Sequence, residues 1–423
     1  MLQHLPQRIQ SRLIGIDDNL ALVLATCVLA RRPILILGRH GTGKSTFCDI
    51  VAELLGLPPA ECAYYDASKD DLVTVAGIPD AGAFEKGGTG ELSFLCHSRT
   101  IWNKRLVLID EITRAPQESQ NMWLEIVGNR TLFGRPLPCE ILVATCNPAT
   151  YASAFELDEA LLDRFCVVCE FPDLRDAPQE RLENVVLTNL ESPREGGDSG
   201  TGRPRSERTA REEVELLRER FRVERAAMLE SAPFRRHVAR WAAYLVRTLH
   251  RLTPEETRVS NRALSEHLAG LACDFLAHHG RPPHAVDCGT ASIVARYVLQ
   301  YRLQLESRII EQATVLSWEV LDMESLNHDS VERDVSIAVH CGRQTFEQFS
   351  AAIRRLLGRK LDANQRMRIE MALRQTARFQ SIHVSRLEQI TSWCRTLAPS
   401  LAPEMELDTA VARVAAAFDS HTA

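Results

Sequence analysis

The 423-residue sequence lacks several features that would tie it to a particular class of partner. It has no excess of positive charge, because 50 lysines and arginines stand against 56 aspartates and glutamates, for a formal net charge of −6. This balance gives no overall electrostatic reason to bind nucleic acid or an anionic membrane. The longest early apolar run, residues 20–30, is too short to span a bilayer, and it predicts a core helix.

The chain also lacks the cysteine spacing of a disulfide framework. Its 12 cysteines are spread singly, which is typical of a protein in a reducing cytosol. Cys166 and Cys169 form a C-x-x-C pair, but a strand would turn them to opposite faces and no second pair completes a metal site. The first residues show no basic-then-apolar signal pattern. We therefore expect a soluble, cytoplasmic protein with two to four domains.

The most informative motif of the sequence lies in residues 33–45. Residues 34–37 are apolar and predict a short buried strand, a glycine-rich turn follows, and Lys44 and Ser45 open a helix to about residue 55. This is G-x-x-x-x-G-K-[ST] in a strand–loop–helix setting, in which backbone N–H groups surround phosphate oxygens. Lys44 would reach the β- and γ-phosphates, and the Ser45 hydroxyl would ligate Mg²⁺. The predicted nucleotide-binding residues are Gly38, Arg39, His40, Gly41, Thr42, Gly43, Lys44 and Ser45.

A second apolar run, residues 106–109, ends in Asp110 and Glu111. A buried strand there would deliver both carboxylates to its C-terminal edge, where ligands bind in parallel α/β sheets. Asp110 would belong to the Mg²⁺ shell, and Glu111 would polarise the attacking water in phosphoryl transfer. Asn147 follows another predicted strand, 140–145, and can hydrogen-bond the attacking water or the γ-phosphate.

Other segments complete a predicted α/β domain. We predict helices at 1–13, 17–30, 117–127 and 157–165, strands at 63–66 and 166–171, and a short helix capped within 68–71. The stretch 73–94 predicts a hairpin or mobile loop, with extended arms 73–79 and 91–94 around a glycine-rich tip. A second hairpin is predicted around Gly134.

The second half of the chain predicts helices. A polar stretch rich in glycine and proline, 191–213, predicts a disordered linker or a surface loop. Helical periodicity then covers 210–251, a segment ending near 280, and 286–305, and about five more helices fill 306–423. That last region carries a basic stretch, interpreted as a solvated helix face or as a contact for an acidic partner or nucleic acid. The basic residues are Arg354, Arg355, Arg359, Lys360, Arg366 and Arg368.

With these landmarks placed, residues 10–305 resemble the MoxR family of AAA+ ATPases. The segment 110–116 is close to the family's DEINRAP signature, 144–148 resembles its sensor-1 strand, and 157–165 resembles its LPEAQLDRF segment. Further matches are Ile14-Gly15, 259–264 and 301–303. Departures are Arg39-His40 in the phosphate loop, Thr113 in the signature, and Asn261 where the family has proline.

The resemblance implies an AAA+ P-loop domain with a parallel sheet at 1–175, a linker and α-helical lid at 176–305, and an additional all-α domain at 306–423. It implies that Arg164 is an arginine finger acting in trans on a neighbouring subunit, and that Arg262 is a sensor 2 that closes the lid. Such a finger implies a ring, typically a homo-hexamer. The two hairpins would correspond to insertions that face the ring pore.

The leading functional hypothesis is therefore an ATP-hydrolysing, chaperone-like ring protein that uses ATP and Mg²⁺ to remodel a protein client. MoxR-like proteins often work with a von Willebrand factor A domain partner. A nucleic-acid-associated motor or defence-system subunit is the first alternative, supported only by the basic stretch. An assembly switch with little turnover is the second, and the full set of Glu111, Asn147 and Arg164 counts against it.

Overall fold

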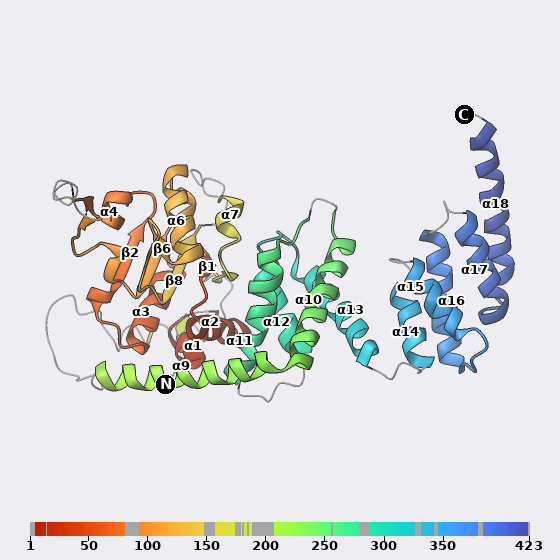
Figure 1. The fold of residues 1–423 in the computed structure, drawn as a ribbon, viewed down its shortest axis with the longest axis horizontal. Coiled ribbons are helices and arrows are strands. Elements are labelled where there is room, and N and C mark those ends of the chain that lie inside the picture. The colour runs from red at the N-terminus through yellow and green to blue at the C-terminus, as the bar shows by residue number, and fades with distance from the viewer. Residues whose placement is uncertain are drawn as a thin grey trace. The chain divides into compact units, whose positions relative to one another are not determined.

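The computed structural model describes residues 5–13, 15–80, 93–147, 157–173, 207–254, 257–279, 288–325, 331–341, 346–379 and 384–421, with a few positions between 179 and 187. The chain forms two compact units (Figure 1). The first contains residues 1–242 and 256–311, and the second contains residues 243–255 and 312–423.

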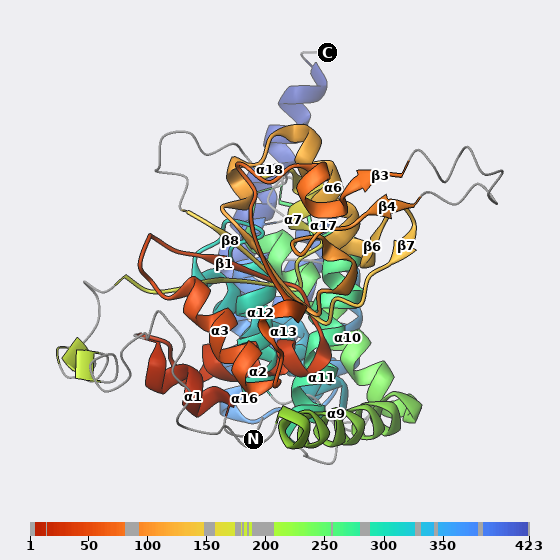
Figure 2. The ribbon, with the colours of Figure 1, turned by 90° about the vertical axis from the view of Figure 1, so that its left-hand side faces the viewer.

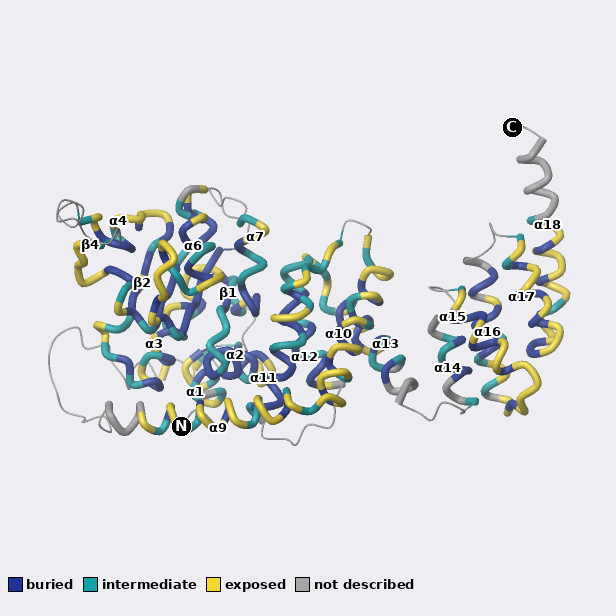
Figure 3. The backbone as a smooth tube through the Cα atoms, viewed as in Figure 1, coloured by how far each residue is buried: buried dark blue, intermediate teal, exposed yellow. Residues whose placement is uncertain are grey.

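The first unit is built on a five-stranded sheet in the order β2-β5-β8-β1-β9, with every pairing parallel. The central strands are almost wholly apolar and buried, because helices cover both faces of such a sheet (Figure 3). This confirms the predicted α/β fold. The strands are β1 (Ile34–Leu37), β2 (Cys62–Asp66), β5 (Leu106–Asp110), β8 (Ile141–Cys146) and β9 (Val167–Glu170).

The helices of this domain form near the predicted positions. Asp17 caps α2, because its side chain accepts the Leu20 N–H at 2.7 Å. Trp123 of α6 is fully buried in the sheet's core. The helices are α1 (Leu5–Arg12), α2 (Asp18–Ala30), α3 (Lys44–Leu54), α6 (Gln117–Asn129) and α7 (Glu159–Leu162), with 3-10 turns at Pro59–Glu61, Ile101–Asn103 and Ile112–Arg114.

The segment predicted as the first hairpin is only partly extended. Leu72–Ala76 forms helix α4, because Asp71 accepts the Thr74 N–H at 2.9 Å and Gly77 follows with a φ of 94°. The prediction of an extended arm from residue 73 was therefore wrong up to Ala76, although the predicted cap is confirmed. Among the described residues, pairing is confined to β3 (Ile78–Pro79) and β4 (Phe94–Leu95). Residues 81–90 of the predicted tip and 91–92 of the predicted second arm lie outside the described residues.

The second predicted hairpin is confirmed. β6 (Thr131–Leu132) pairs antiparallel with β7 (Arg135–Pro136) around Gly134. Phe133 at its turn stacks on Phe94 of β4 with ring centroids 5.3 Å apart, so the two hairpins lie side by side (Figure 2).

Helices follow the sheet domain along the chain, and the second half of one of them, residues 243–252, belongs to the second unit. Residues 207–213, predicted as linker, already belong to α9, and the rest of that linker lies outside the described residues. The single helical stretch predicted over 210–251 is broken at Ser231, because Pro233 has no N–H and is tolerated only in a first turn. The elements are α9 (Glu207–Glu230), α10 (Ala232–Leu252), a π-helix (Ala263–Ala269), α11 (Gly270–His279) and α12 (Cys288–Leu299).

The described part of residues 306–423 contains six helices, one more than the sequence suggested. The apolar core of the second unit gathers around Phe349, Ile390 and Trp393. The helices are α13 (Ser307–Ser325), α14 (Val331–Cys341), α15 (Phe346–Leu356), α16 (Ala363–Phe379), α17 (Val384–Leu397) and α18 (Ala402–His421). Among the helices that the structure describes, none has the length and hydropathy needed to cross a membrane.

Candidate nucleotide-binding site

Three neighbouring strands, β5, β8 and β1, direct the predicted site residues to one edge of the sheet. All three run parallel, so their carboxyl ends meet there. β1 leads into the glycine loop, β5 ends at Asp110, and Asn147 follows β8. They surround a pocket of about 330 Å³ lined by His40, Gly41, Gly43, Lys44, Ser45, Thr46, Asp110, Glu111 and Asn147.

The glycine loop has the backbone shape of a phosphate cradle. Gly41 and Gly43 have φ values of 82° and 87°, a region that L side chains rarely adopt. A Cβ on Gly43 would lie 2.6 Å from the Leu13 side chain, so this position has no space for one. The Thr42 hydroxyl donates to the Arg39 carbonyl at 2.9 Å and closes the turn. The loop therefore needs its glycines.

Lys44 lies at the base of this cradle. Its Nζ donates to the carbonyls of Gly38 and Arg39 at 2.7 and 2.8 Å. Burial lowers the pKa of Lys44, and the opposing charges of Asp110 and Glu111 partly offset this. The ammonium is thus partly desolvated and bonded to neutral carbonyls. A phosphate group would offer it a charged acceptor and therefore a stronger bond.

Thr145, to which the sequence assigned no role, fixes the Asp110 carboxylate. β5 and β8 pair with Ile109 opposite Ala144, so the next residues, Asp110 and Thr145, are level. The Thr145 hydroxyl donates to Asp110 Oδ1 and accepts the Glu111 N–H at 3.2 Å. The sequence offered no signal for this role, because only the pairing of β5 with β8 brings Thr145 beside Asp110.

Glu111 lies just beyond the end of β5, which was predicted to include it. Its φ of 53° is left-handed, a costly conformation for a residue other than glycine and one found often at active sites. Asn147 Nδ2 donates to its Oε1 at 3.1 Å, and Arg114 pairs with its Oε2 at 2.9 Å. His40 Nε2 lies 3.7 Å from Oε1. The carboxylate is therefore positioned from three sides.

The donor set fits a nucleotide-bound magnesium ion. Mg²⁺ takes one or two protein oxygens together with substrate phosphates and water, and the Ser45 hydroxyl and Asp110 carboxylate are lining oxygens that could hold such an ion. The Asn147 Oδ1 is buried and has no hydrogen-bond partner among the described residues, so an acceptor stands ready for a water or ligand donor.

The remaining predicted residues lie outside the pocket lining. Arg39 is exposed and pairs with Asp173 at 3.5 Å. Arg164 lies against Gly128 of α6, with its Nε buried and without a hydrogen-bond partner in the described structure. Arg262 pairs with Asp163 at 3.7 Å and with Glu266 at 3.5 Å.

Asp163, just before Arg164, is held by several groups that sequence reasoning did not single out. Its carboxylate accepts the Ser260 hydroxyl at 2.6 Å, and His267 Nε2 contacts its backbone carbonyl at 2.8 Å. Arg302 lies 4.0 Å from the carboxylate. Both candidate arginines are thereby connected through one short segment, 162–165, to residues between 260 and 302 that follow the sheet domain in the chain.

Fold and site together define a P-loop nucleotide-binding protein. Residues 33–165 match the AAA domain of the dynein-related subfamily, and the chain has an AAA+ α/β fold with a mostly helical C-terminal part. A crystal structure of a "putative ATPase" from Cytophaga hutchinsonii is similar in fold, with a TM-score of 0.51 and 16% identity, covering 74% of this chain and 93% of that one. No curated protein matches this chain in sequence.

Proposed function

We propose that this protein hydrolyses ATP to ADP and phosphate at the pocket bounded by the glycine loop, Asp110, Glu111 and Asn147. The observation that carries the proposal is the convergence of these groups from three adjacent strands on one pocket. A match to an AAA domain over residues 33–165 supports it.

The residues divide the chemistry between them. The loop N–H groups and Lys44 bind the β- and γ-phosphates. Glu111, held by Asn147 and Arg114, accepts a proton from a water whose oxygen attacks the γ-phosphorus as the bond to the β-phosphate oxygen breaks. Mg²⁺, held by Ser45 and Asp110, supplies charge neutralisation at the phosphates when bound. Asn147 also offers Oδ1 to orient the water.

Lys44→Ala tests the assignment of the pocket. We expect nucleotide affinity to fall at least about tenfold, because a charge-assisted bond is lost, and hydrolysis to fall to background. Lys104→Ala is a matched control, because that lysine is also buried and bonded to a carbonyl, but it lies outside the pocket. Hydrolysis by Lys44→Ala at the wild-type rate would contradict the proposal.

We further propose a homo-hexameric ring of MoxR type in which Arg164 acts in trans and hydrolysis drives remodelling of a protein client. Arg164 lines no part of its own chain's pocket, and its buried Nε lacks a partner among the described residues, as suits a group that serves another subunit. Two adjacent hairpins, β3–β4 and β6–β7, offer a projecting surface for a client. A von Willebrand factor A domain protein is the partner proposed from the family resemblance.

A trap variant tests this second part. Glu111→Gln should bind ATP without hydrolysing it, and tagged protein from the native host should retain its client. Recovery of a von Willebrand factor A protein or a metalloenzyme supports remodelling. Nuclease-sensitive recovery of DNA or RNA would favour a nucleic-acid motor over a remodeller of protein clients. Nucleotide-dependent oligomerisation with negligible turnover by the wild-type protein would indicate an assembly switch.

A further inference from the structure

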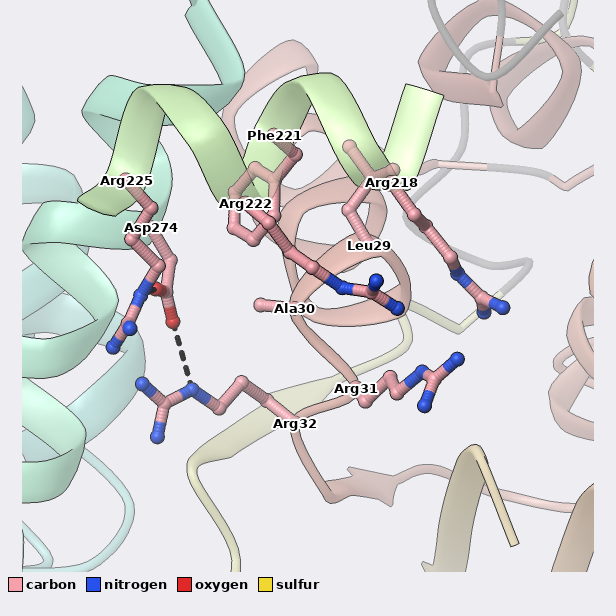
Figure 4. A pocket seen from close by; sticks show the side chains of 9 residues that line it. All are labelled: Leu29, Ala30, Arg31, Arg32, Arg218, Phe221, Arg222, Arg225 and Asp274. Carbon is pink, nitrogen blue, oxygen red and sulfur yellow. Dashed lines mark hydrogen bonds and ion pairs between the residues drawn. The ribbon is translucent and has the colours of Figure 1, made fainter. Parts of the chain in front are cut away.

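A second pocket, of about 380 Å³, lies in the first unit near the start of β1, whereas the glycine loop follows the end of that strand. Figure 4 shows α9 on one side of this pocket and the last turn of α2 with the residues after it on the other. It is lined by Leu29, Ala30, Arg31, Arg32, Arg218, Phe221, Arg222, Arg225 and Asp274. It shares no residue with the nucleotide pocket.

All five basic residues of the lining are arginines, and two carboxylates, one buried and one partly buried, are shared among them. Asp274, with a side chain 1% exposed, pairs with both Arg32 and Arg225. Glu140 pairs with Arg31 and Arg218, and also with Arg105 outside the lining. The lining itself holds five arginines and one carboxylate, Asp274. With Glu140 and the two glutamates that pair with Arg222 included, four carboxylates face five lining arginines, and the pocket keeps a net positive charge.

Arg222 is the lining arginine with the weakest attachment. Its side chain is 53% exposed and pairs only with Glu215 and Glu219 among the described residues, both on its own helix and both largely exposed. Exposed pairs of this kind contribute little and exchange readily with solvent. Figure 4 shows its guanidinium reaching across the pocket toward Arg31, so it is available to a ligand there.

Arg218 has unmet bonding capacity. It is 2% exposed and donates through Nη1 to Glu140, but its Nε and Nη2 are buried without hydrogen-bond partners among the described residues. Burial is also the largest cause of a lowered pKa for Arg218. A buried guanidinium with two unsatisfied donor atoms is costly, and because Arg218 lines the pocket, a small shift of its side chain toward an anion there would satisfy them.

The chemistry selects a phosphate-bearing ligand. Guanidinium groups present paired N–H donors that match two oxygens of a phosphate, and several of them around one cavity suit more than one phosphate group. We propose that this arginine pocket binds a small compound with two or more phosphate groups. Leu29, Ala30 and Phe221 form an apolar wall that can contact the organic part of such a compound.

A small ligand fits better than a nucleic-acid strand. The volume lies in the usual range for small-molecule pockets. The chain's net charge of −6 provides no broad positive field to attract a long polyanion.

The probe is inorganic tripolyphosphate, titrated calorimetrically into the full chain carrying Lys44→Ala, which removes the main cation of the nucleotide pocket. We expect saturable binding that weakens with salt. Adding Arg222→Gln should weaken it about tenfold, the effect of losing one charge-assisted contact. Arg220→Gln is the matched control, because Arg220 is an exposed arginine of the same helix that pairs with Glu224, but it lies outside the pocket. It should change the affinity less than twofold.

Other outcomes overturn the proposal. If tripolyphosphate shows no saturable binding, or if the Arg222→Gln and Arg220→Gln proteins bind it equally well, the arginine pocket is not a phosphate site. Binding of a single-stranded oligonucleotide that depends on Arg222, without binding of tripolyphosphate, would make the surface a nucleic-acid contact instead. Because every arm carries Lys44→Ala, the result is independent of whether the nucleotide pocket hydrolyses ATP.

Discussion

The Asn147 side-chain amide donates a hydrogen bond to the Glu111 carboxylate at 3.1 Å. Asn147 is 5% exposed and follows β8, whereas Glu111 follows β5 in a left-handed conformation. The bond therefore aligns the ends of two adjacent strands at the pocket. It also leaves the Asn147 Oδ1 as an acceptor for a water beside the same carboxylate.

Asn147→Ala should reduce hydrolysis by about tenfold to a hundredfold, because Glu111 loses a positioning partner and the water loses an acceptor. Nucleotide affinity should change much less, since the loop and Lys44 remain intact. Steady-state hydrolysis and fluorescent-nucleotide binding measure the two effects. A loss confined to affinity would show that Asn147 binds nucleotide without acting on the water.

Thr145→Val removes a hydroxyl that contacts both Asp110 and the Glu111 N–H, while conserving the side chain's shape. We expect the Mg²⁺ concentration for half-maximal hydrolysis to rise and the free energy of unfolding to fall by about 1–2 kcal/mol. Thr376→Val is the control, because Thr376 is equally buried and bonded to a carbonyl in the second unit. It should lower stability without changing the Mg²⁺ requirement, and an equal Mg²⁺ shift in both variants would argue against the role of Thr145.

His267 makes stability depend on pH. Burial, aided by the charge of Arg302, lowers the pKa of His267 from 6.5 to about 4. Between these values the unfolded chain binds a proton that the folded chain does not, so stability is full above about pH 6.5 and falls as the pH drops toward 4. The contribution is at most roughly 3 kcal/mol.

Replacing this group tests its share of the pH dependence. His267→Gln keeps an N–H donor for the Asp163 carbonyl but cannot titrate. Urea unfolding of the variant should show a shallower loss of stability between pH 6.5 and 4 than the wild type. Equal slopes would assign the pH dependence to other groups.

Arg164→Ala should abolish hydrolysis if the arginine acts in trans, since an added cation at the phosphoryl group contributes about 10³–10⁵ in rate. Mixing Arg164→Ala with Lys44→Ala should restore part of the activity, because a subunit with an intact pocket then meets a neighbour with an intact Arg164. Each variant alone should be inactive. A mixture that assembles but stays inactive would count against action in trans.

The sheet and the pocket were predictable because their residues carry strong local patterns. Apolar runs fix β1, β5 and β8, and each predicted group of the pocket follows such a run directly in the sequence. Thr145 was not assigned because a threonine within a buried strand looks the same whether it packs or bonds. Its role depends on register with Asp110, which only strand pairing determines.

Helix α9 shows a second reason why part of the structure could not be predicted from the sequence. Val214, Phe221 and Met228 are buried at seven-residue spacing, and Arg218 and Arg225 fall on the same stripe. This pattern places arginines on the packed face, but sequence alone cannot show which partner they meet. Glu140 and Asp274 lie 78 and 49 residues from them in the chain. The arginine pocket therefore becomes visible only in three dimensions.

The central claim is that the pocket around Glu111 hydrolyses ATP, and Glu111→Gln tests it most directly. The variant keeps the side chain's size and an oxygen for Asn147 but cannot accept a proton. We predict that it binds ATP with near wild-type affinity while its hydrolysis rate, measured by phosphate release, falls by about 10²–10⁴. Wild-type hydrolysis by a purified, ATP-binding Glu111→Gln protein would contradict the account.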